Sequence, residues 1–267
     1  MVSSPPDLLD HREAISRVLR DRTTGLFLDI DGTLAPFQPD PAAVTVSDAV
    51  RRAIATLAER LAVVVLSGRA TDDSQRIIGV DGITYVGNHG CQSLRDGQEW
   101  ILPAAQEFVS RIHRVAADAS VRFAHFPGIY VEDKGPSVSI HYRNTPDRPA
   151  AAAAIDTFID EHPAAKGLRR SGGKLVKEIR PPLDINKGTA VTAVVEERGL
   201  GAAVMIGDDI TDVDAFLAIT RMRDSGHIQG LSIGVLSDGI PDEVLTTTDY
   251  TLAGTDEVER LLVWLAG

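Results

Sequence analysis

A short apolar run that ends in two carboxylates and a glycine constrains this chain more than any other stretch. Residues 26 to 33 read Leu-Phe-Leu-Asp-Ile-Asp-Gly-Thr. Such a run is typical of a buried parallel strand whose carboxyl end opens into a site. Residues two apart on a strand face the same side, so Asp29 and Asp31 start toward one region, where they repel each other unless a cation or proton is shared. The alternative is an ordinary polar turn, in which Asp and Gly are common.

The order of apolar segments predicts a doubly wound α/β core. Strands are expected at the following ranges: 26–29, 62–66, 83–86, 202–206 and 232–235. Helices are expected between them, at 7–20, after the N-cap Ser47, at 71–78, at 187–198, from about 213, and at 256–265. Strands that alternate with helices favour a Rossmann-like parallel sheet that binds its ligands at the carboxyl ends of the strands.

Between these halves the pattern changes. Two helices are expected, at 104–119 and 148–161. Extended segments are expected at 121–126, 129–133, 137–142, 167–170 and 174–179. This mixture predicts a small α+β domain over 104–182, inserted into a core made of 1–103 and 183–267.

Composition and charge exclude some classes of protein. The 27 basic and 38 acidic residues give a formal net charge of -11, which argues against a nucleic-acid-binding protein. An anionic substrate stays open, because a metal or a local basic cluster can reverse the field. The single cysteine, Cys91, fits a reducing compartment. Because no segment resembles a membrane span or a secretory signal, we expect a cytoplasmic protein with no membrane partner, and we expect a monomer.

Four polar elements follow predicted strands or begin helices. They are Asp29 with Asp31, Ser67, Lys187, and the group Asp208, Asp209 and Asp212. Taken singly, each has a plain structural alternative: a common turn, a surface lysine at a helix start, or a solvated loop with an N-cap. Taken together at the ends of parallel strands, they indicate phosphoryl transfer from a monoester.

Each residue then has an expected role in that chemistry. Asp29 would attack phosphorus and form an aspartyl-phosphate, and Asp31 would serve as general acid and base. Ser67 and Lys187 would bind and neutralise the phosphoryl oxygens. A hard cation, Mg²⁺, would be held by Asp29, the backbone carbonyl of Asp31, and Asp208.

This set resembles the haloacid dehalogenase-like (HAD) phosphatases. The resemblance rests on four ordered motifs: Asp29-x-Asp31-Gly32-Thr33, Ser67, Lys187, and Gly207-Asp208-Asp209-x-x-Asp212. It implies that Asp29 is the nucleophile, that Asp31 is the acid/base, and that Asp209 and Asp212 support the metal ligands. It also implies that the inserted domain is a cap that determines substrate specificity.

A finer resemblance is to the trehalose-6-phosphate phosphatase family. It rests on Ser67-Gly68-Arg69, Asn88-His89-Gly90, Glu132-Asp133-Lys134 with Ser137, His141-Tyr142-Arg143, Glu178-Ile179-Arg180-Pro181 and Lys187-Gly188. It implies hydrolysis of trehalose 6-phosphate in trehalose biosynthesis. It also implies substrate contacts at Arg69, Asn88, His89, Glu132, Lys134, His141, Arg143, Lys174, Glu178 and Arg180. The stretch Leu183 to Asn186 and Cys91 depart from the usual pattern and put fine substrate fit in doubt.

Several alternatives stay open at this point. The charged residues of the inserted domain fit equally well a solvated sheet face with cross-strand ion pairs. The same chemistry fits another sugar phosphate, such as sucrose 6-phosphate or mannosyl-3-phosphoglycerate. A phospho-sensing module or a sugar-phosphate-binding protein without turnover would also use an acidic pair, although pure binding has no need of the acid/base Asp31.

Overall fold

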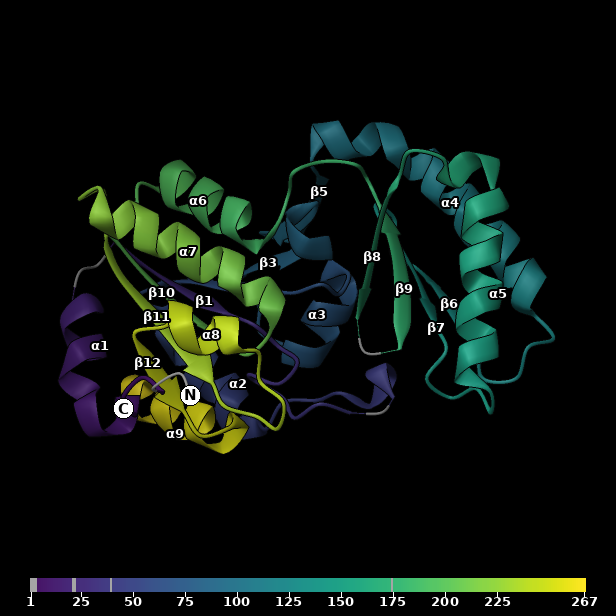
Figure 1. Ribbon diagram of the computed structural model, residues 1–267. Coiled ribbons are helices and arrows are strands. Elements are labelled where there is room, and N and C mark those ends of the chain that lie inside the picture. Colours follow the sequence, from purple (N-terminus) through teal and green to yellow (C-terminus); the bar gives the residue numbers. More distant parts are fainter. Residues whose placement is uncertain (1–3, 21–22, 39, 174) are drawn as a thin grey trace. The chain divides into compact units, whose positions relative to one another are not determined.

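The computed structural model describes residues 4–20, 23–38, 40–173 and 175–267 (Figure 1). The chain divides into two compact units. One, the core unit, consists of Met1–Glu99 and Ile185–Gly267, and the other, the inserted unit, is Trp100–Asp184. The cap function of the inserted unit stays a prediction. Among the described residues, none of the helices combines the length and apolar character needed to cross a bilayer.

The core unit is built on an eight-stranded sheet with the order β12-β11-β10-β1-β2-β3-β4-β5. Its strands are β1 Thr24–Leu28, β2 Ala62–Leu66, β3 Thr84–Gly87, β4 Gln92–Arg95, β5 Gln98–Ile101, β10 Ala202–Gly207, β11 Gln229–Val235 and β12 Tyr250–Leu252. The strands from β12 to β3 are parallel, and β4 pairs antiparallel with β3. This arrangement confirms the predicted parallel-rich α/β core.

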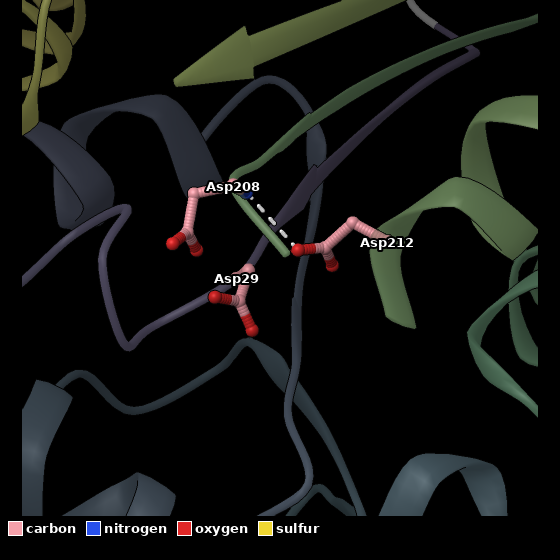
Figure 2. Close-up of side chains that lie close together, drawn as sticks. All are labelled: Asp29, Asp208 and Asp212. Carbon is pink, nitrogen blue, oxygen red and sulfur yellow. Dashed lines mark hydrogen bonds between the residues drawn. The ribbon is translucent and has the colours of Figure 1, made fainter. Parts of the chain in front are cut away.

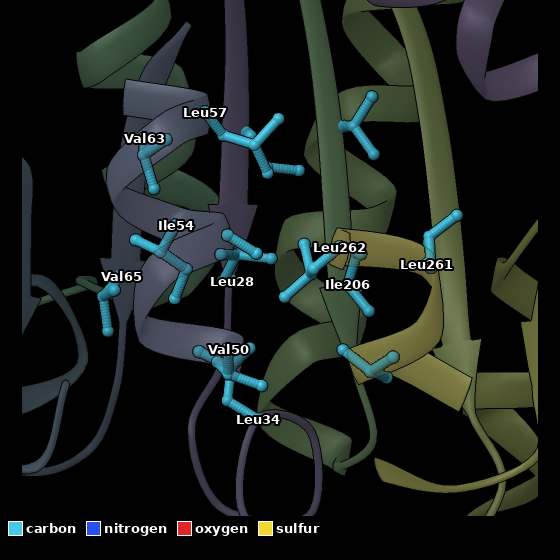
Figure 3. Close-up of a cluster of buried hydrophobic side chains, with 14 of the residues drawn as sticks. Leu28, Leu34, Val50, Ile54, Leu57, Val63, Val65, Ile206, Leu261 and Leu262 are labelled. Atoms are coloured by element: carbon cyan, nitrogen blue, oxygen red, sulfur yellow. The ribbon is translucent and has the colours of Figure 1, made fainter. Parts of the chain in front are cut away.

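Helices cover both faces of this sheet. The described helices and 3-10 turns of the core unit are η1 Leu8–His11, α1 Arg12–Val18, η2 Pro41–Ala43, α2 Asp48–Ala58, α3 Thr71–Ile78, η3 Asn88–Gly90, α6 Lys187–Arg198, α7 Ile210–Asp224, α8 Asp242–Thr247 and α9 Thr255–Ala266. Alternate residues of β1 pack on opposite faces of the sheet. Leu28 packs with α2 and α9 (Figure 3), as does Leu26, whereas Phe27 packs with α6 and α7. Because both faces are buried, the strand is apolar throughout, as the sequence predicts.

The inserted unit contains an antiparallel sheet with the order β6-β7-β9-β8 and two long helices. Its elements are β6 Tyr130–Asp133, β7 Val138–His141, β8 Arg169–Gly173, β9 Val176–Arg180, α4 Pro103–Phe123, α5 Arg148–Glu161 and η4 Pro163–Ala165. Val138, Ile140 and Ile179 pack with α4 and α5 in one apolar cluster. The residues between them in sequence therefore project from the opposite face of the sheet.

One prediction about secondary structure is wrong, and one helix begins earlier than expected. The segment Val121–Phe126 is not extended, because α4 continues to Phe123, whose ring is buried in the apolar cluster of the inserted unit. The helix expected from Val213 begins at Ile210, since Asp209 caps it by accepting the backbone N–H of Ile210 at 2.7 Å. The sequence analysis also missed β4, β5, α8 and β12.

Candidate active site

Three neighbouring strands of the core unit deliver polar side chains to the same edge of the sheet. Strand β1 lies between β10 and β2, and Leu28 is in register with Ile206 on one side and Val65 on the other. The backbone N–H of Asp29 continues this pairing by donating to the carbonyl of Ile206 at 3.1 Å. The residues that follow these strands therefore come together, as the sequence predicts.

Lys187 joins this edge from the first position of α6. Its Nζ donates to Asp29 Oδ1 and to Asp212 Oδ1, both at 2.6 Å, and all three side chains are almost fully buried. Burial disfavours the charged ammonium, but the charges of Asp212 and Asp29 outweigh it and raise the pKa of Lys187. A cation at a helix N-terminus also opposes the helix dipole, and the carboxylates of Asp29 and Asp212 offset this cost.

Three carboxylates form a compact acidic cluster (Figure 2). Asp29 directly follows β1, Asp208 directly follows β10, and Asp212 is in the first turn of α7. One oxygen each of Asp29, Asp208 and Asp212 lies within 4.8 Å of the others. Asp212 Oδ2 accepts the backbone N–H groups of Asp208 at 3.1 Å and Asp209 at 3.0 Å, which fixes the loop that carries Asp208. Thr33 Oγ1 donates to Asp208 Oδ1 at 3.3 Å.

The acidic cluster carries more negative charge than Lys187 balances. Burial raises the pKa of Asp29 well above its ordinary value, against the opposing charge of Lys187, and the charges of Asp212 and Asp208 add to the increase. Burial and the charges of Asp212 and Asp209 raise the pKa of Asp208 to about 7. A closely spaced set of oxygen donors with surplus negative charge fits a hard divalent cation such as Mg²⁺ or Ca²⁺.

The turn after β1 brings the backbone close to this cluster. Gly32 has a φ of +88°, and a Cβ built there would lie 2.1 Å from Asp208 Oδ2. Only glycine combines this backbone conformation with the space that the Asp208 carboxylate needs.

The predicted acid/base Asp31 is paired with Arg69, which the resemblance assigned to the substrate. Arg69 Nε donates to Asp31 Oδ2 at 2.6 Å, and Nη2 donates to Oδ1 at 2.7 Å. Arg69 Nη1 donates to Asp73 Oδ2 at 2.6 Å and to the carbonyl of Pro41 at 3.1 Å. The acidic cluster is thus formed without the Asp31 side chain. The sequence analysis missed Asp73, although its position four residues after Arg69 at the start of a helix is a usual spacing for an ion pair.

Ser67, Asn88 and His89 lie beside the backbone of residues 67–69, since the N–H of Asn88 donates to the carbonyl of Arg69 at 2.8 Å and the N–H of His89 donates to the carbonyl of Ser67 at 3.2 Å. Ser67 is buried, and its Oγ accepts the backbone N–H of Arg69 at 3.2 Å. Asn88 is also buried, and its Nδ2 donates to Gln92 Oε1 at 2.7 Å. The ring of His89 packs directly against Gly68, where a Cβ would lie 2.6 Å from His89 Cε1. Ser67, Asn88 and His89 therefore surround the backbone of Arg69.

The inserted unit gathers four predicted substrate residues on the polar face of its sheet. Glu132, Ser139, Glu178 and Ser171 are in register across β6, β7, β9 and β8. Glu178 Oε1 accepts from Lys134 Nζ and from the hydroxyls of Ser137 and Ser139, each at 3.4 Å, and Oε2 accepts from Ser171 Oγ at 3.1 Å. Glu132 Oε2 lies 2.8 Å from His141 Nε2. The sequence analysis missed Ser139 and Ser171. Ser139 stands between the apolar residues Val138 and Ile140, and this alternation could have placed it on the polar face, whereas β8 has no such alternation around Ser171.

The remaining predicted substrate residues lie at or beyond the ends of these strands. Arg143 follows β7, and its carbonyl accepts Arg148 Nε at 3.1 Å. Arg180 ends β9, and its Nε is buried without a hydrogen-bond partner among the residues that the structure describes. Lys174 lies outside the described residues.

Comparison with known proteins identifies relatives of this chain. A "Trehalose_PPase" family model, described as trehalose-phosphatase, matches residues 27–254. The chain is 37% identical over 253 residues to a "Trehalose-phosphate phosphatase" of Mycobacterium avium (strain 104), covering 91% of this chain and 63% of that protein. It is 29% identical over 274 residues to "Probable trehalose-phosphate phosphatase 4" of Oryza sativa subsp. japonica, covering 99% and 71%.

Solved structures share the fold of this chain. A crystal structure of a "trehalose-6-phosphate phosphatase related protein" superposes with a TM-score of 0.74 at 26% identity, covering 91% of this chain and 96% of the other. The C-terminal domain of the C. albicans trehalose-6-phosphate phosphatase superposes with a TM-score of 0.76 at 21% identity, covering 100% and 99%, which shows a shared fold. Since the family model spans most of the sequence, the chain belongs to the trehalose-phosphatase family.

Proposed function

We propose that this protein hydrolyses trehalose 6-phosphate to trehalose and phosphate through an aspartyl-phosphate at Asp29, with Mg²⁺ as cofactor. The observation that carries this proposal is the buried ammonium of Lys187 shared between Asp29 and Asp212, next to Asp208. Membership of the trehalose-phosphatase family and the trehalose-phosphate phosphatase names of its relatives support the substrate.

Asp29 is the nucleophile in this proposal. Lys187 holds Asp29 Oδ1, so Oδ2 is the oxygen that attacks phosphorus as the bond from phosphorus to the sugar oxygen breaks. Lys187 and Ser67 bind phosphoryl oxygens as charge redistributes. Because each of these groups is buried, water does not screen their interaction with the phosphoryl group.

Asp31 transfers protons in both half-reactions. It first gives a proton to the leaving sugar oxygen, and it then takes a proton from the water that attacks phosphorus and frees Asp29. Arg69 donates to both carboxylate oxygens of Asp31. Asp31 has to leave Arg69 before it can donate a proton in the first half-reaction.

The metal ligands in this proposal are Asp29, Asp208 and the backbone carbonyl of Asp31. The bound cation would supply charge neutralisation for the phosphoryl oxygens. Asp212 fixes the backbone of Asp208 and Asp209, so Asp209 and Asp212 act in support of the metal ligands.

The inserted unit is the substrate-specificity cap in this proposal. A disaccharide offers many hydroxyl groups, and the polar face of the β6-β7-β9-β8 sheet offers carboxylates, an ammonium and an imidazole to bind them. We propose sugar contacts at Glu132, Lys134, His141, Arg143, Lys174, Glu178 and Arg180. A site of this kind rejects analogues that leave its buried polar groups unpaired. A cytoplasmic, monomeric protein is also proposed, and a sequence with one cysteine, Cys91, is consistent with a reducing compartment.

A panel of sugar phosphates tests the proposed substrate. Phosphate release is measured from trehalose 6-phosphate, sucrose 6-phosphate, glucose 6-phosphate and mannosyl-3-phosphoglycerate, with Mg²⁺ and with chelator. We expect Mg²⁺-dependent turnover with a strong preference for trehalose 6-phosphate. Preference for another member of the panel would contradict the proposed sugar contacts but keep the core chemistry, and a folded protein that turns over none would favour the binding or sensing alternatives.

A further inference from the structure

An exposed aromatic ring stands on the polar face of the inserted unit. Tyr130 is the first residue of β6, and 62% of it is exposed. Its sequence neighbours Ile129 and Val131 pack against the apolar cluster that α4 and α5 cover. Because side chains alternate along a strand, Tyr130 projects from the same face as Glu132. The ring is thus presented on the face that holds the predicted sugar contacts.

His141 supports this ring from the neighbouring strand. Tyr130 and His141 are directly opposite in the β6–β7 register, and their rings stack with centroids 5.8 Å apart and planes inclined by 29°. His141 Nε2 is in turn 2.8 Å from Glu132 Oε2, and Glu132 Oε2 lies 3.9 Å from Lys134 Nζ. The aromatic ring and the charged groups therefore form one connected row whose orientations depend on one another.

The chemistry of this row suits a pyranose ring. A pyranose has hydroxyl groups around its edge and a patch of C–H groups on its face. The hydroxyl groups need hydrogen-bonding partners, which Glu132 and Lys134 provide, and the C–H patch needs an apolar surface, which an aromatic ring provides.

We propose that Tyr130 is an additional substrate contact, on which one pyranose ring of the sugar phosphate stacks. This inference rests on the proposed function. Tyr130 lies two residues before Glu132, so it belongs to the same strand and the same face as the polar contacts. In this arrangement His141 has two tasks: it holds the Glu132 carboxylate on one side and supports the Tyr130 ring on the other.

The test compares a sugar substrate with one that has no ring. Values of kcat/KM are measured for trehalose 6-phosphate and for glycerol 2-phosphate in the wild type, Tyr130→Ala, Tyr130→Leu and Tyr130→Phe. We expect Tyr130→Ala to lower kcat/KM for trehalose 6-phosphate about ten-fold, mainly through KM, and to leave glycerol 2-phosphate unchanged. Tyr130→Phe keeps the ring and should stay within about two-fold of the wild type for both substrates.

A matched control separates this role from a general effect of losing an exposed aromatic residue. Trp264 is 40% exposed on α9 of the core unit, and Trp264→Ala should not alter the ratio of the two kcat/KM values. If Tyr130→Ala does not fold, Tyr130→Leu, which keeps an apolar side chain, gives the same comparison. Equal losses with both substrates, or no loss with trehalose 6-phosphate, would overturn the proposal.

The proposed function is tested separately by the wild type alone. A wild type that prefers a different disaccharide phosphate contradicts the proposed substrate. The Tyr130 variants are then compared with that disaccharide phosphate and glycerol 2-phosphate, again as the ratio of the two kcat/KM values. In either case the aromatic contact is supported if Tyr130→Ala lowers kcat/KM for the disaccharide phosphate and leaves kcat/KM for glycerol 2-phosphate unchanged.

Discussion

Replacing Asp208 with asparagine should stabilise the metal-free protein while it destroys the site. Burial and the charges of Asp212 and Asp209 raise the pKa of Asp208 from its ordinary 3.8 to about 7. The folded state therefore binds this proton more tightly than the unfolded state. The resulting contribution to stability is fully present below a pH of about 3.8 and is lost as the pH rises through about 7. The amide of the Asp208→Asn variant cannot ionise. At pH 8 the variant therefore keeps the contribution to stability that the wild type has lost.

The size of the effect follows from the two pKa values. The difference between 3.8 and about 7 corresponds to about 4 kcal/mol at about 1.4 kcal/mol per pKa unit. Water reaches part of the half-buried Asp208 carboxylate and screens the repulsion, so we expect a gain of about 2 kcal/mol. Asparagine also keeps an oxygen that can accept the hydrogen bond from Thr33 Oγ1.

Urea denaturation in the presence of chelator measures this gain. Asp208→Asn should be about 2 kcal/mol more stable than the wild type at pH 8 and about equal to it at pH 4. Asp209→Asn removes one of the charges that raise the pKa of Asp208 but keeps the cap of α7, so its gain at pH 8 should be smaller than that of Asp208→Asn. Added Mg²⁺ should stabilise the wild type more than Asp208→Asn. An Asp208→Asn protein that is less stable than the wild type at pH 8 in chelator would refute the argument from charge repulsion.

Two further variants test other charged contacts of the core unit. Lys187→Met should lower the free energy of unfolding by about 3–5 kcal/mol, because it leaves Asp29 and Asp212 buried without their cation. Adding Asp212→Asn should recover part of this loss. Urea denaturation of the two single variants and the double variant measures both effects. Asp73→Asn should cost about 1 kcal/mol at pH 7, because Asp73 accepts from Arg69 and Arg76. Although burial opposes it, these contacts lower the pKa of Asp73, so its contribution is present above a pH of about 4 and is lost as the pH falls through the lowered value. An equal difference between Asp73→Asn and the wild type at pH 7 and pH 2.5 would contradict this account.

The core of the fold could be predicted because its strands are buried on both faces. The range 62–66 reads Ala-Val-Val-Val-Leu and is strand β2 with the same bounds. Helices α5 and α6 also have their predicted bounds, since a Pro at the first turn of α5 and Gly199 after α6 mark their ends. At these elements the local sequence signals and the pattern of burial predict the same structure.

The missed elements depend on signals of a different kind. Asp96 and Gly97 both have positive φ, at 50° and 72°, and they join β4 to β5 in the dipeptide turn that is typical of hairpins. This signal was present in the sequence and was overlooked. Strand β12 has only three residues and is defined by its pairing with β11, which no local pattern shows.

The residues of the candidate site were easier to predict than their pairing. Parallel strands place Asp29 and Asp208 at one edge, so their approach follows from strand order alone. The contacts of Lys187 with Asp212 and of Arg69 with Asp31 depend on how helices pack and which rotamers they allow. The resemblance therefore assigned Arg69 to the substrate, whereas the structure joins it to the proposed acid/base.

The central claim is that the carboxylate of Asp29 attacks phosphorus, and the Asp29→Asn variant tests it most directly. Phosphate release from trehalose 6-phosphate is measured with Mg²⁺ for the wild type and for Asp29→Asn, and circular dichroism confirms that the variant is folded. An amide in place of the carboxylate is a poor nucleophile, so we predict that turnover is abolished in a folded protein. Asp29→Asn that keeps more than a few per cent of wild-type activity would contradict the proposed aspartyl-phosphate mechanism.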